Sequence, residues 1–268
     1  MSTFLADGFR SVDSSADTEK LGRCLSAMED LADFRAYKQK SFEALNLRSD
    51  SDVADIACGL GYDLLKLRQL VPDGGVTGFD ISEAFVAAAR DLAASDESVR
   101  VVQGDVHEMA IDDGAFDGAR TDRSLQHMEK PDVAVSEMAR IVKQGGTVVA
   151  AEPDWTSYHL VSDNAEVSAV IEREFGSTIR NPAIGRQLVD LLGKQLQIGH
   201  HSVHPILLRH LPDAEIIFDI THSVQRCCDK QLITKDDGRA FLESLSRRSE
   251  NGTFFALLCV HVVSGIKR

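Results

Sequence analysis

This chain of 268 residues has little positive charge, few cysteines and no long apolar run. It carries 29 Lys and Arg against 42 Asp and Glu, a formal net charge of −13, which argues against a nucleic-acid partner because such surfaces need clustered basic residues. None of the five cysteines belongs to a Cys-x-x-Cys pair, so we expect reduced thiols and no metal site. Residues 1–17 are too polar for a signal peptide and no run could span a membrane. We therefore expect a cytoplasmic protein without stable membrane insertion.

Apolar strands alternate with amphipathic helices in the middle of the chain. We expect strands at residues 53–57, 75–79, 99–103, 116–120 and 146–151. The helices between them are expected at about 61–71, 83–94 and 131–142. This alternation is typical of a parallel sheet covered by helices on both faces, an α/β fold.

The flanking segments follow other patterns. Residues 1–50 are polar and then helical, with apolar residues at helical spacing over 29–45, and we interpret them as an N-terminal helical cap. The main domain then covers 51–268. The alternation breaks after Trp155, which predicts a helical lid insertion at about 156–211, including a helix at 184–196. Two more strands are expected at 214–220 and 254–264, with a helix near 234–247 between them.

The most informative segment is the loop after the first predicted strand. This strand ends in an acid at Asp55, and small residues follow at Ala57, Gly59 and Gly61 before a helix begins. The second strand ends on Asp80, nineteen residues after Gly61. Small residues let a ligand lie against the backbone, and a carboxylate at the next strand end can accept bonds from both ribose hydroxyls. The pattern therefore predicts a cofactor that contains a nucleoside.

The cofactor can be narrowed by what the loop lacks. A dinucleotide fingerprint would place a third glycine where Leu64 stands, and no Gly-Lys-Ser/Thr of a phosphate-binding loop follows. The segment instead resembles motif I of the class I S-adenosylmethionine-dependent methyltransferases, Asp-x-Gly-x-Gly-x-Gly, with Ala57 at the first glycine. Gly104-Asp105, Phe116-Asp117 and Lys143 to Gly146 also match positions of this family, and the chain looks most similar to its small-molecule branch, related to ubiquinone and menaquinone methyltransferases.

The resemblance implies a Rossmann-like sheet of seven mostly parallel strands with helices on both faces, an antiparallel last strand and a helical lid. The implied cofactor is S-adenosyl-L-methionine. The implied activity is methyl transfer to a small-molecule acceptor by in-line displacement, in specialised metabolism. The neutral thioether leaves without an acid, so positioning and exclusion of water can supply most of the acceleration.

The resemblance also assigns cofactor-binding residues. Asp80 would accept the ribose hydroxyls, Ile81 and Val106 would pack on adenine, and Asp105 would accept its amino group. Asp55 would orient the loop or meet the methionine amino group through water, with a purely structural role as the alternative. The carbonyl of Arg120 or Thr121 would face the methionyl part. Arg35 and Tyr37 are candidates for the cofactor carboxylate, or ordinary residues of a helix surface.

Residues after the fourth and fifth strands are candidates for the acceptor side. His127 could act as general base or serve only for shape, and Arg123 is expected to pair with Asp122 or Glu152. Glu152, Trp155 and Tyr158 follow the fifth strand, where they could hold an amine by charge and cation–π contact. Arg180 could bind an acidic acceptor or cap a helix. We interpret His200, His201 and His204 as a loop without metal.

Several alternatives stay open at this stage. The acceptor could be a quinone, prenyl or lipid-like compound methylated on carbon, or the chain could be a catalytically inactive relative that binds the cofactor. The segment from Thr121 to Ser124 stands where nucleic-acid base methyltransferases carry Asn/Asp-Pro-Pro-Tyr/Phe, which argues against that class. The sequence does not distinguish N-, O- and C-methylation, or a monomer from a homo-oligomer.

Overall fold

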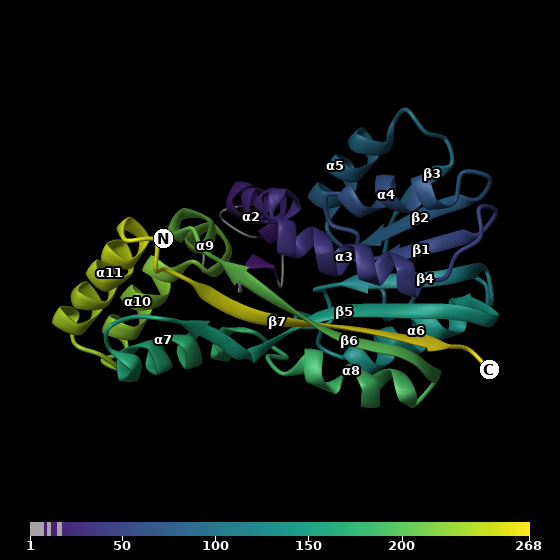
Figure 1. Cartoon of the computed structure of the whole chain (residues 1–268). Helices are drawn as coiled ribbons and strands as arrows, with labels where there is room; N and C mark the ends of the chain where they lie inside the picture. The colour runs from purple at the N-terminus through teal and green to yellow at the C-terminus, as the bar shows by residue number, and fades with distance from the viewer. Residues whose placement is uncertain (1–7, 10–11, 15–17) are drawn as a thin grey trace.

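A single seven-stranded sheet organises the protein in the computed structural model, which describes residues 8–9, 12–14 and 18–268 (Figure 1). The strand order is β3-β2-β1-β4-β5-β7-β6. Strands β1 to β5 run parallel, and β7 is antiparallel to both of its neighbours, β5 and β6. This topology confirms the predicted Rossmann-like sheet with a reversed last strand.

The first half of the sheet follows the predicted alternation closely. Its strands are β1 (Asp52–Ile56), β2 (Gly75–Asp80), β3 (Val99–Gln103) and β4 (Phe116–Asp122). Its helices are α4 (Tyr62–Leu70), α5 (Glu83–Ala93) and α6 (Pro131–Ile141). The Ser82 side chain accepts a bond from Phe85 N and caps α5, while Pro131 begins α6 where its missing N–H costs nothing.

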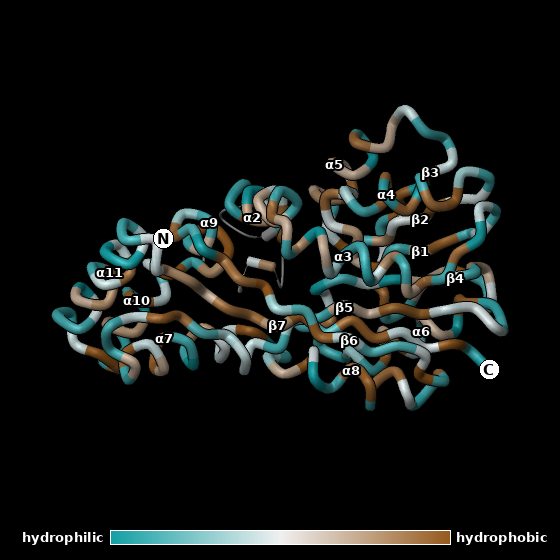
Figure 2. Tube along the Cα trace, viewed as in Figure 1, coloured by the Kyte–Doolittle hydropathy of each residue, from teal (hydrophilic) through white to brown (hydrophobic). Residues whose placement is uncertain are grey.

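Alternate residues of the strands build two apolar layers, one on each face of the sheet. Val149 and Ala151 share a core with α3 (Ala32–Ala44), α4 and α5. Val148 and Ala150 share the other core with α6 and α8 (Ile184–Gly193). This period of two follows from the alternation of side chains along a strand, and in Figure 2 the central strands show brown apolar stretches between white and teal ones.

The second half of the sheet contains a fifth strand much longer than predicted and a sixth strand that the sequence did not predict. Strand β5 spans Val142–Leu160, and β6 (Gln197–Leu208) and β7 (Ala256–Ile266) extend beside it. Around the far end of β6 and β7 gather α7 (Ala165–Thr178), α9 (Leu211–Phe218), α10 (Ile220–Asp229) and α11 (Lys235–Glu250), seen on the left of Figure 1. Strand β7, helix α8 and helix α11 agree with the elements expected at 254–264, 184–196 and 234–247.

Two predictions in this half are wrong. The expected strand at 214–220 is helix α9, because Ala214, Ile217 and Phe218 are buried at helical spacing. The histidine segment is not a loop but edge strand β6, whose exposed and polar residues hid its pairing with β7. Strand β6 lies inside the segment interpreted as a lid, 156–211.

The N-terminal region contains two helices rather than one. Helix α2 (Thr18–Asp30) and helix α3 are separated at Leu31, which has extended backbone angles. Before them, the short helix η1 (Val12–Ser14) lies near α5, where Asp13 accepts bonds from Ser82 Oγ and Glu83 N. The division into cap, main domain and lid stays a prediction. Within the described ranges, no helix is long and apolar enough to cross a membrane.

Candidate functional site

The loop after β1 turns through three left-handed residues. Ala57, Gly59 and Gly61 have φ angles of 57°, 55° and 83°. At Gly61 an added Cβ would lie 2.9 Å from the Ala89 Cβ, so glycine lets the loop approach α5. Alanine stands at position 57 in a left-handed conformation, which carries a penalty of about 1 kcal/mol. Strained backbone of this kind is common at ligand sites.

Asp80 ties this loop to the end of β2. One carboxylate oxygen accepts a bond from Gly59 N at 2.9 Å, and the other accepts from Ser82 N at 2.9 Å. The residue is 8% exposed, and burial raises the pKa of its carboxyl despite these two N–H donors. Each oxygen keeps a further lone pair for a hydroxyl donor.

A cavity of about 600 Å³ opens at the carboxyl ends of β1, β2 and β4. It brings together most of the residues predicted from the sequence, namely Ala57, Gly59, Asp80, Ile81, Asp105, Val106, His127, Trp155 and Arg180. The carboxyl ends of parallel strands are the usual ligand site of open α/β sheets. The predicted cofactor and acceptor residues therefore share one cavity.

At the nucleoside side of this cavity, apolar and acidic groups alternate. Ile81 leaves 66% of its surface exposed, which is unusual for an aliphatic residue and suits a ligand that would cover it. Val106 is buried beside it in the cavity wall. Asp105 accepts bonds from His107 N and lies 2.6 Å from His107 Nδ1, and the backbone N–H lowers the pKa of its carboxyl.

Beneath the loop lies a buried network of charges that the sequence did not predict. Arg120, 1% exposed, donates to Asp55, Asp63 and Asp122 at 3.0–3.2 Å. Its Nε also donates to Ser41 Oγ, and its guanidinium lies over the Phe42 ring. The network connects the N-terminal helix α3 to the strand ends that form the cavity.

Asp122 and Arg123 end β4 and line the cavity. Tyr37 donates its hydroxyl to Asp122, while the Arg123 guanidinium lies 5.4 Å from the Phe34 ring centre. Arg123 has φ 54°, and its buried Nε has no hydrogen-bond partner among the described residues. Its Nε is 4.0 Å from an Asp122 oxygen, so of the two partners expected from the sequence, Asp122 is the one observed.

Glu152 does not face the cavity. Its side chain is fully buried and accepts bonds from Ser124 N, Leu125 N and Gln126 N, at 2.8, 2.7 and 3.3 Å. Burial raises the pKa of this carboxyl to about 8. The hypothesis of a catalytic or amine-binding Glu152 is therefore wrong, because its oxygens hold the backbone after β4.

Tyr158 is also absent from the cavity wall. It is 2% exposed and packs with Trp155, Phe175 and Phe218, with ring centres 4.7–6.0 Å from its own. An acceptor cannot reach it without displacing this cluster. The predicted contact between Tyr158 and substrate is therefore replaced by a structural role, and Trp155 alone of the two lines the cavity.

Five of the predicted cofactor residues lie outside the cavity wall, including Tyr37, whose bond to Asp122 is described above. Arg35 donates to the carbonyls of Glu29 and Asp30 at the end of α2, because the break at Leu31 places it there. Thr121 is buried within β4, which extends two residues beyond its predicted end, and donates to the Ile56 carbonyl. Asp55 is held by Arg120, and burial raises the pKa of its carboxyl to about 7. Gly61 has the packing role described above.

The acceptor side of the cavity is held by the segments after β4 and β5. Trp155 Nε1 donates to Gln126 Oε1 at 2.5 Å, and Gln126 Nε2 donates to the Arg123 carbonyl. His127 lies beside Gln126 in the cavity wall, with the Phe9 ring 5.5 Å from its own. These bonds use both ends of the Gln126 amide, which leaves His127 as the neighbouring group able to take a proton.

Some lining residues were missed for lack of a sequence signal. Phe9 and Asp13 come from a polar segment without periodicity, and only the fold places them at the cavity. A signal did exist for the charge network: Arg120 stands within a predicted central strand, at its last position. An arginine there requires buried carboxylates nearby, since an unpaired charge is not tolerated in a core.

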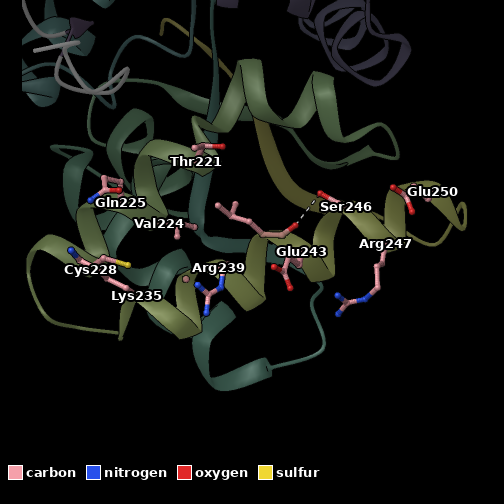
Figure 3. A pocket seen from close by; sticks show the side chains of 12 residues that line it. Thr221, Val224, Gln225, Cys228, Lys235, Arg239, Glu243, Ser246, Arg247 and Glu250 are labelled. Carbon is pink, nitrogen blue, oxygen red and sulfur yellow. Dashed lines mark hydrogen bonds between the residues drawn. The ribbon is translucent and has the colours of Figure 1, made fainter.

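A second hollow, of about 700 Å³, lies between α10 and α11 (Figure 3). Lys235, Arg239, Glu243, Arg247 and Glu250 line it from one face of α11, a mixture typical of a solvated helix surface. It lies away from the strand ends, and we assign it no ligand. Over the described ranges, no group of three or more metal-ligating side chains occurs, including around the histidines of β6.

Comparison with known proteins supports the assignment of this cavity. Residues 54–150 match a family model described as methyltransferase domain. The chain is 34% identical over 235 residues to a 37.1 kDa protein in transposon TN4556 of Streptomyces fradiae, covering 85% of this chain and 66% of that protein. It is 32% identical over 119 residues to demethylmenaquinone methyltransferase of Staphylococcus aureus, covering 44% of this chain and 49% of that protein. The chain thus spans half to two thirds of the curated relatives it matches.

A solved structure of geranyl diphosphate methyltransferase superposes with a TM-score of 0.55 at 14% identity, over 87% of this chain and 78% of that one. This likeness concerns the fold alone. The glycine loop and Asp80 both lie within residues 54–150, the segment that matches the methyltransferase domain model. Residues 54–150 are a methyltransferase domain, with the sheet order and glycine loop of the class I S-adenosylmethionine-dependent methyltransferases.

Proposed function

We propose that this protein transfers a methyl group from S-adenosyl-L-methionine to a small-molecule acceptor in specialised metabolism. The observation that carries the proposal is one cavity that reaches from Asp80 to Trp155 and Arg180. A cavity of about 600 Å³ is of the size that encloses small molecules. The acidic net charge favours a small acceptor over a nucleic acid.

The residues at the nucleoside side fit the cofactor. The two Asp80 oxygens would accept the ribose hydroxyls, Ile81 and Val106 would cover adenine, and Asp105 would accept its amino group. At the other end, Asp122 and Arg123 offer opposite charges for the ammonium and carboxylate of the methionyl part. S-adenosylmethionine supplies an electrophilic methyl group on a positively charged sulfur.

The protein's contribution to the reaction is mainly enclosure and positioning. Phe9, Trp155 and Phe175 would exclude water and hold the acceptor against the strand ends. His127, held on the backbone by a bond from its N–H to the Ser124 carbonyl, would take the proton of a hydroxyl or amine acceptor. A thiolate would not need this step, whereas a carbon acceptor still loses a proton, from its activating hydroxyl or from the methylated carbon.

A second candidate function is C-methylation of a quinone, prenyl or lipid-like acceptor. The apolar residues of the acceptor side and the similarity to demethylmenaquinone methyltransferase over residues 54–150 favour it. A catalytically inactive, cofactor-binding relative is the third. Transfer of a labelled methyl group to a panel of phenols, amines, quinones and prenylated compounds distinguishes the three.

The cofactor part of the proposal is tested by titrating S-adenosylhomocysteine in a calorimeter. We expect saturable binding that weakens by at least about 100-fold in Asp80→Ala, since two charge-assisted bonds contribute about 1.5–3 kcal/mol each. Asp190→Ala, an exposed acid of α8, is the control and should bind as the unmodified protein does. Asp80→Asn, which keeps the side chain's shape, and circular dichroism separate lost binding from lost folding. Absence of binding by the unmodified protein would refute the proposal.

The role of His127 is tested separately by His127→Ala. We expect turnover of a hydroxyl or amine acceptor to fall by about 10²-fold, the usual contribution of a general base, while S-adenosylhomocysteine affinity stays unchanged. The turnover of His127→Ala should recover as pH rises toward the acceptor's own pKa. Unchanged turnover at neutral pH would show that His127 serves only for shape.

A further inference from the structure

The acceptor side of the cavity combines apolar walls with an arginine. Its apolar lining comes from four different elements and comprises Trp155, Phe175, Ile179, Ile217, Leu258 and Val260. Arg180 lines the same cavity and is itself solvent-exposed. Among the described residues, no carboxylate lies within ion-pair distance of its guanidinium. The charge of Arg180 is therefore not neutralised within the described part of the protein, and it stands at the wall of the cavity.

The backbone around Arg180 is held firmly against the segment after β4. Asn181 N donates to the Gln126 carbonyl at 3.0 Å. The Asn181 side chain donates to the carbonyls of Leu125 and Met128, at 2.9 and 2.8 Å. Trp155 N donates to the Pro182 carbonyl at 2.8 Å. Four hydrogen bonds therefore fix the position of Arg180 relative to Trp155 and His127.

The acids that line the cavity do not offset this charge. Asp13, Asp80 and Asp105 accept backbone N–H bonds at the nucleoside side, and Asp122 is held by Tyr37 and Arg120. Glu152, the one acid that the sequence offered for an amine, is enclosed by three backbone N–H groups. The remaining lining acid is Glu129, an exposed residue next to Met128.

We propose that the acceptor is an anionic amphiphile, whose carboxylate or phosphate binds Arg180 while its apolar body lies against Trp155 and Phe175. This inference rests on the proposed function and names its substrate class. Guanidinium bonds to such oxyanions are charge-assisted and planar, and Arg180 presents five N–H donors. The anchored end leaves the rest of the molecule to reach toward His127 and the cofactor.

The sole tryptophan of the chain, Trp155, lines this part of the cavity and makes binding visible without turnover. The probes are octanoate, octyl phosphate, octanamide and octylamine, which share one apolar body and differ in charge. Each is titrated against the protein saturated with S-adenosylhomocysteine, and the quenching of tryptophan fluorescence is recorded. The two anions distinguish a carboxylate from a phosphate as the preferred group.

We expect at least one anion to bind about tenfold or more tightly than the amide, as one charge-assisted pair allows, and the amine to bind most weakly. Arg180→Gln should abolish this preference, and Arg180→Lys should keep part of it because the charge remains. Arg173→Gln, an exposed arginine on α7 outside the cavity, should change nothing. Glu129→Gln should leave the preference for anions in place.

Three results would overturn the inference: equal affinity for the anion and the amide, an anion preference that survives in Arg180→Gln, or no quenching by any probe. Tighter binding of octylamine that is lost in Glu129→Gln would reverse the assigned charge. Because S-adenosylhomocysteine binding is measured first and by calorimetry, failure of the acceptor inference is distinguishable from failure of the cofactor proposal.

Discussion

Replacing Arg120 by methionine should destabilise this protein more than most single substitutions do. The guanidinium is almost fully buried and bonds Asp55, Asp63 and Asp122, with Ser41 as a further acceptor. Methionine fills much of the volume but leaves three buried carboxylates without this cation. Breaking a buried ion pair typically costs about 3–5 kcal/mol, a large share of the roughly 5–15 kcal/mol that holds a domain folded.

Above about pH 7, where Asp55 is ionised, the charges of the network are balanced, and this balance gives the experiment, carried out at pH 8, its second arm. Four cations face four carboxylates, namely Lys38, Lys66, Arg120 and Arg123 against Glu29, Asp55, Asp63 and Asp122. Arg120→Met leaves one excess negative charge, which Asp55→Asn removes. We therefore expect the double variant to be more stable than Arg120→Met by about 1–3 kcal/mol, although Asp55→Asn alone destabilises the protein.

Urea denaturation followed by circular dichroism measures these free energies of unfolding. Arg48→Met is the matched control, because the Arg48 side chain is 71% exposed and its ion pairs with Asp50 and Asp117 lie in solvent. It should change the free energy of unfolding by less than about 0.5 kcal/mol. The reasoning fails if Arg120→Met costs less than 1 kcal/mol, or if the two substitutions destabilise additively.

Three further predictions concern the same region. Burial raises the pKa of Asp55 to about 7, so the folded state binds more protons than the unfolded state from about pH 4 to 7. The free energy of unfolding should therefore fall as pH rises through this window. In Asp55→Asn, the urea midpoint should not show this dependence on pH. Glu152→Ala should lower the free energy of unfolding by about 3 kcal/mol or more, because three backbone N–H groups lose their acceptor. A loss of turnover without destabilisation would contradict this structural role. Ala57→Gly should leave stability unchanged or raise it by up to about 1 kcal/mol in a thermal melt, and clear destabilisation would show that φ 57° carries no strain.

Local patterns predicted the first half of the fold well. The alternating strands and helices over residues 52–141 occur within one or two residues of their expected positions, because each strand is a short apolar run bounded by turn residues. The same local rules failed at 214–220, where an apolar run forms a helix, and at 197–208, where a polar run forms a strand. Both segments take their conformation from what they pack against, which a window of sequence does not contain.

The candidate site divides in a similar way. Asp80, Ile81 and Asp105 were predictable because each follows a strand end at a fixed distance from the glycine loop, and parallel strands bring such ends to one edge. Glu152 and Tyr158 were equally close to a strand end, yet their side chains are buried in other contacts. A strand alternates its side chains between two faces, and which of them reaches a cavity depends on the elements that cover each face.

The sequence by itself determined the glycine loop after β1, the acid at the next strand end and therefore the family and its methyl donor. These features depend on spacing along one chain, which the backbone geometry of strand, turn and helix converts directly into position. Only the tertiary structure decided which side chains meet across elements. It joined Arg120 to the N-terminal helix, turned Glu152 away from the cavity, and placed Arg180 beside Trp155 from a segment 25 residues further along the chain. Long-range packing and buried charge pairing set those positions, and neither is written in a local pattern.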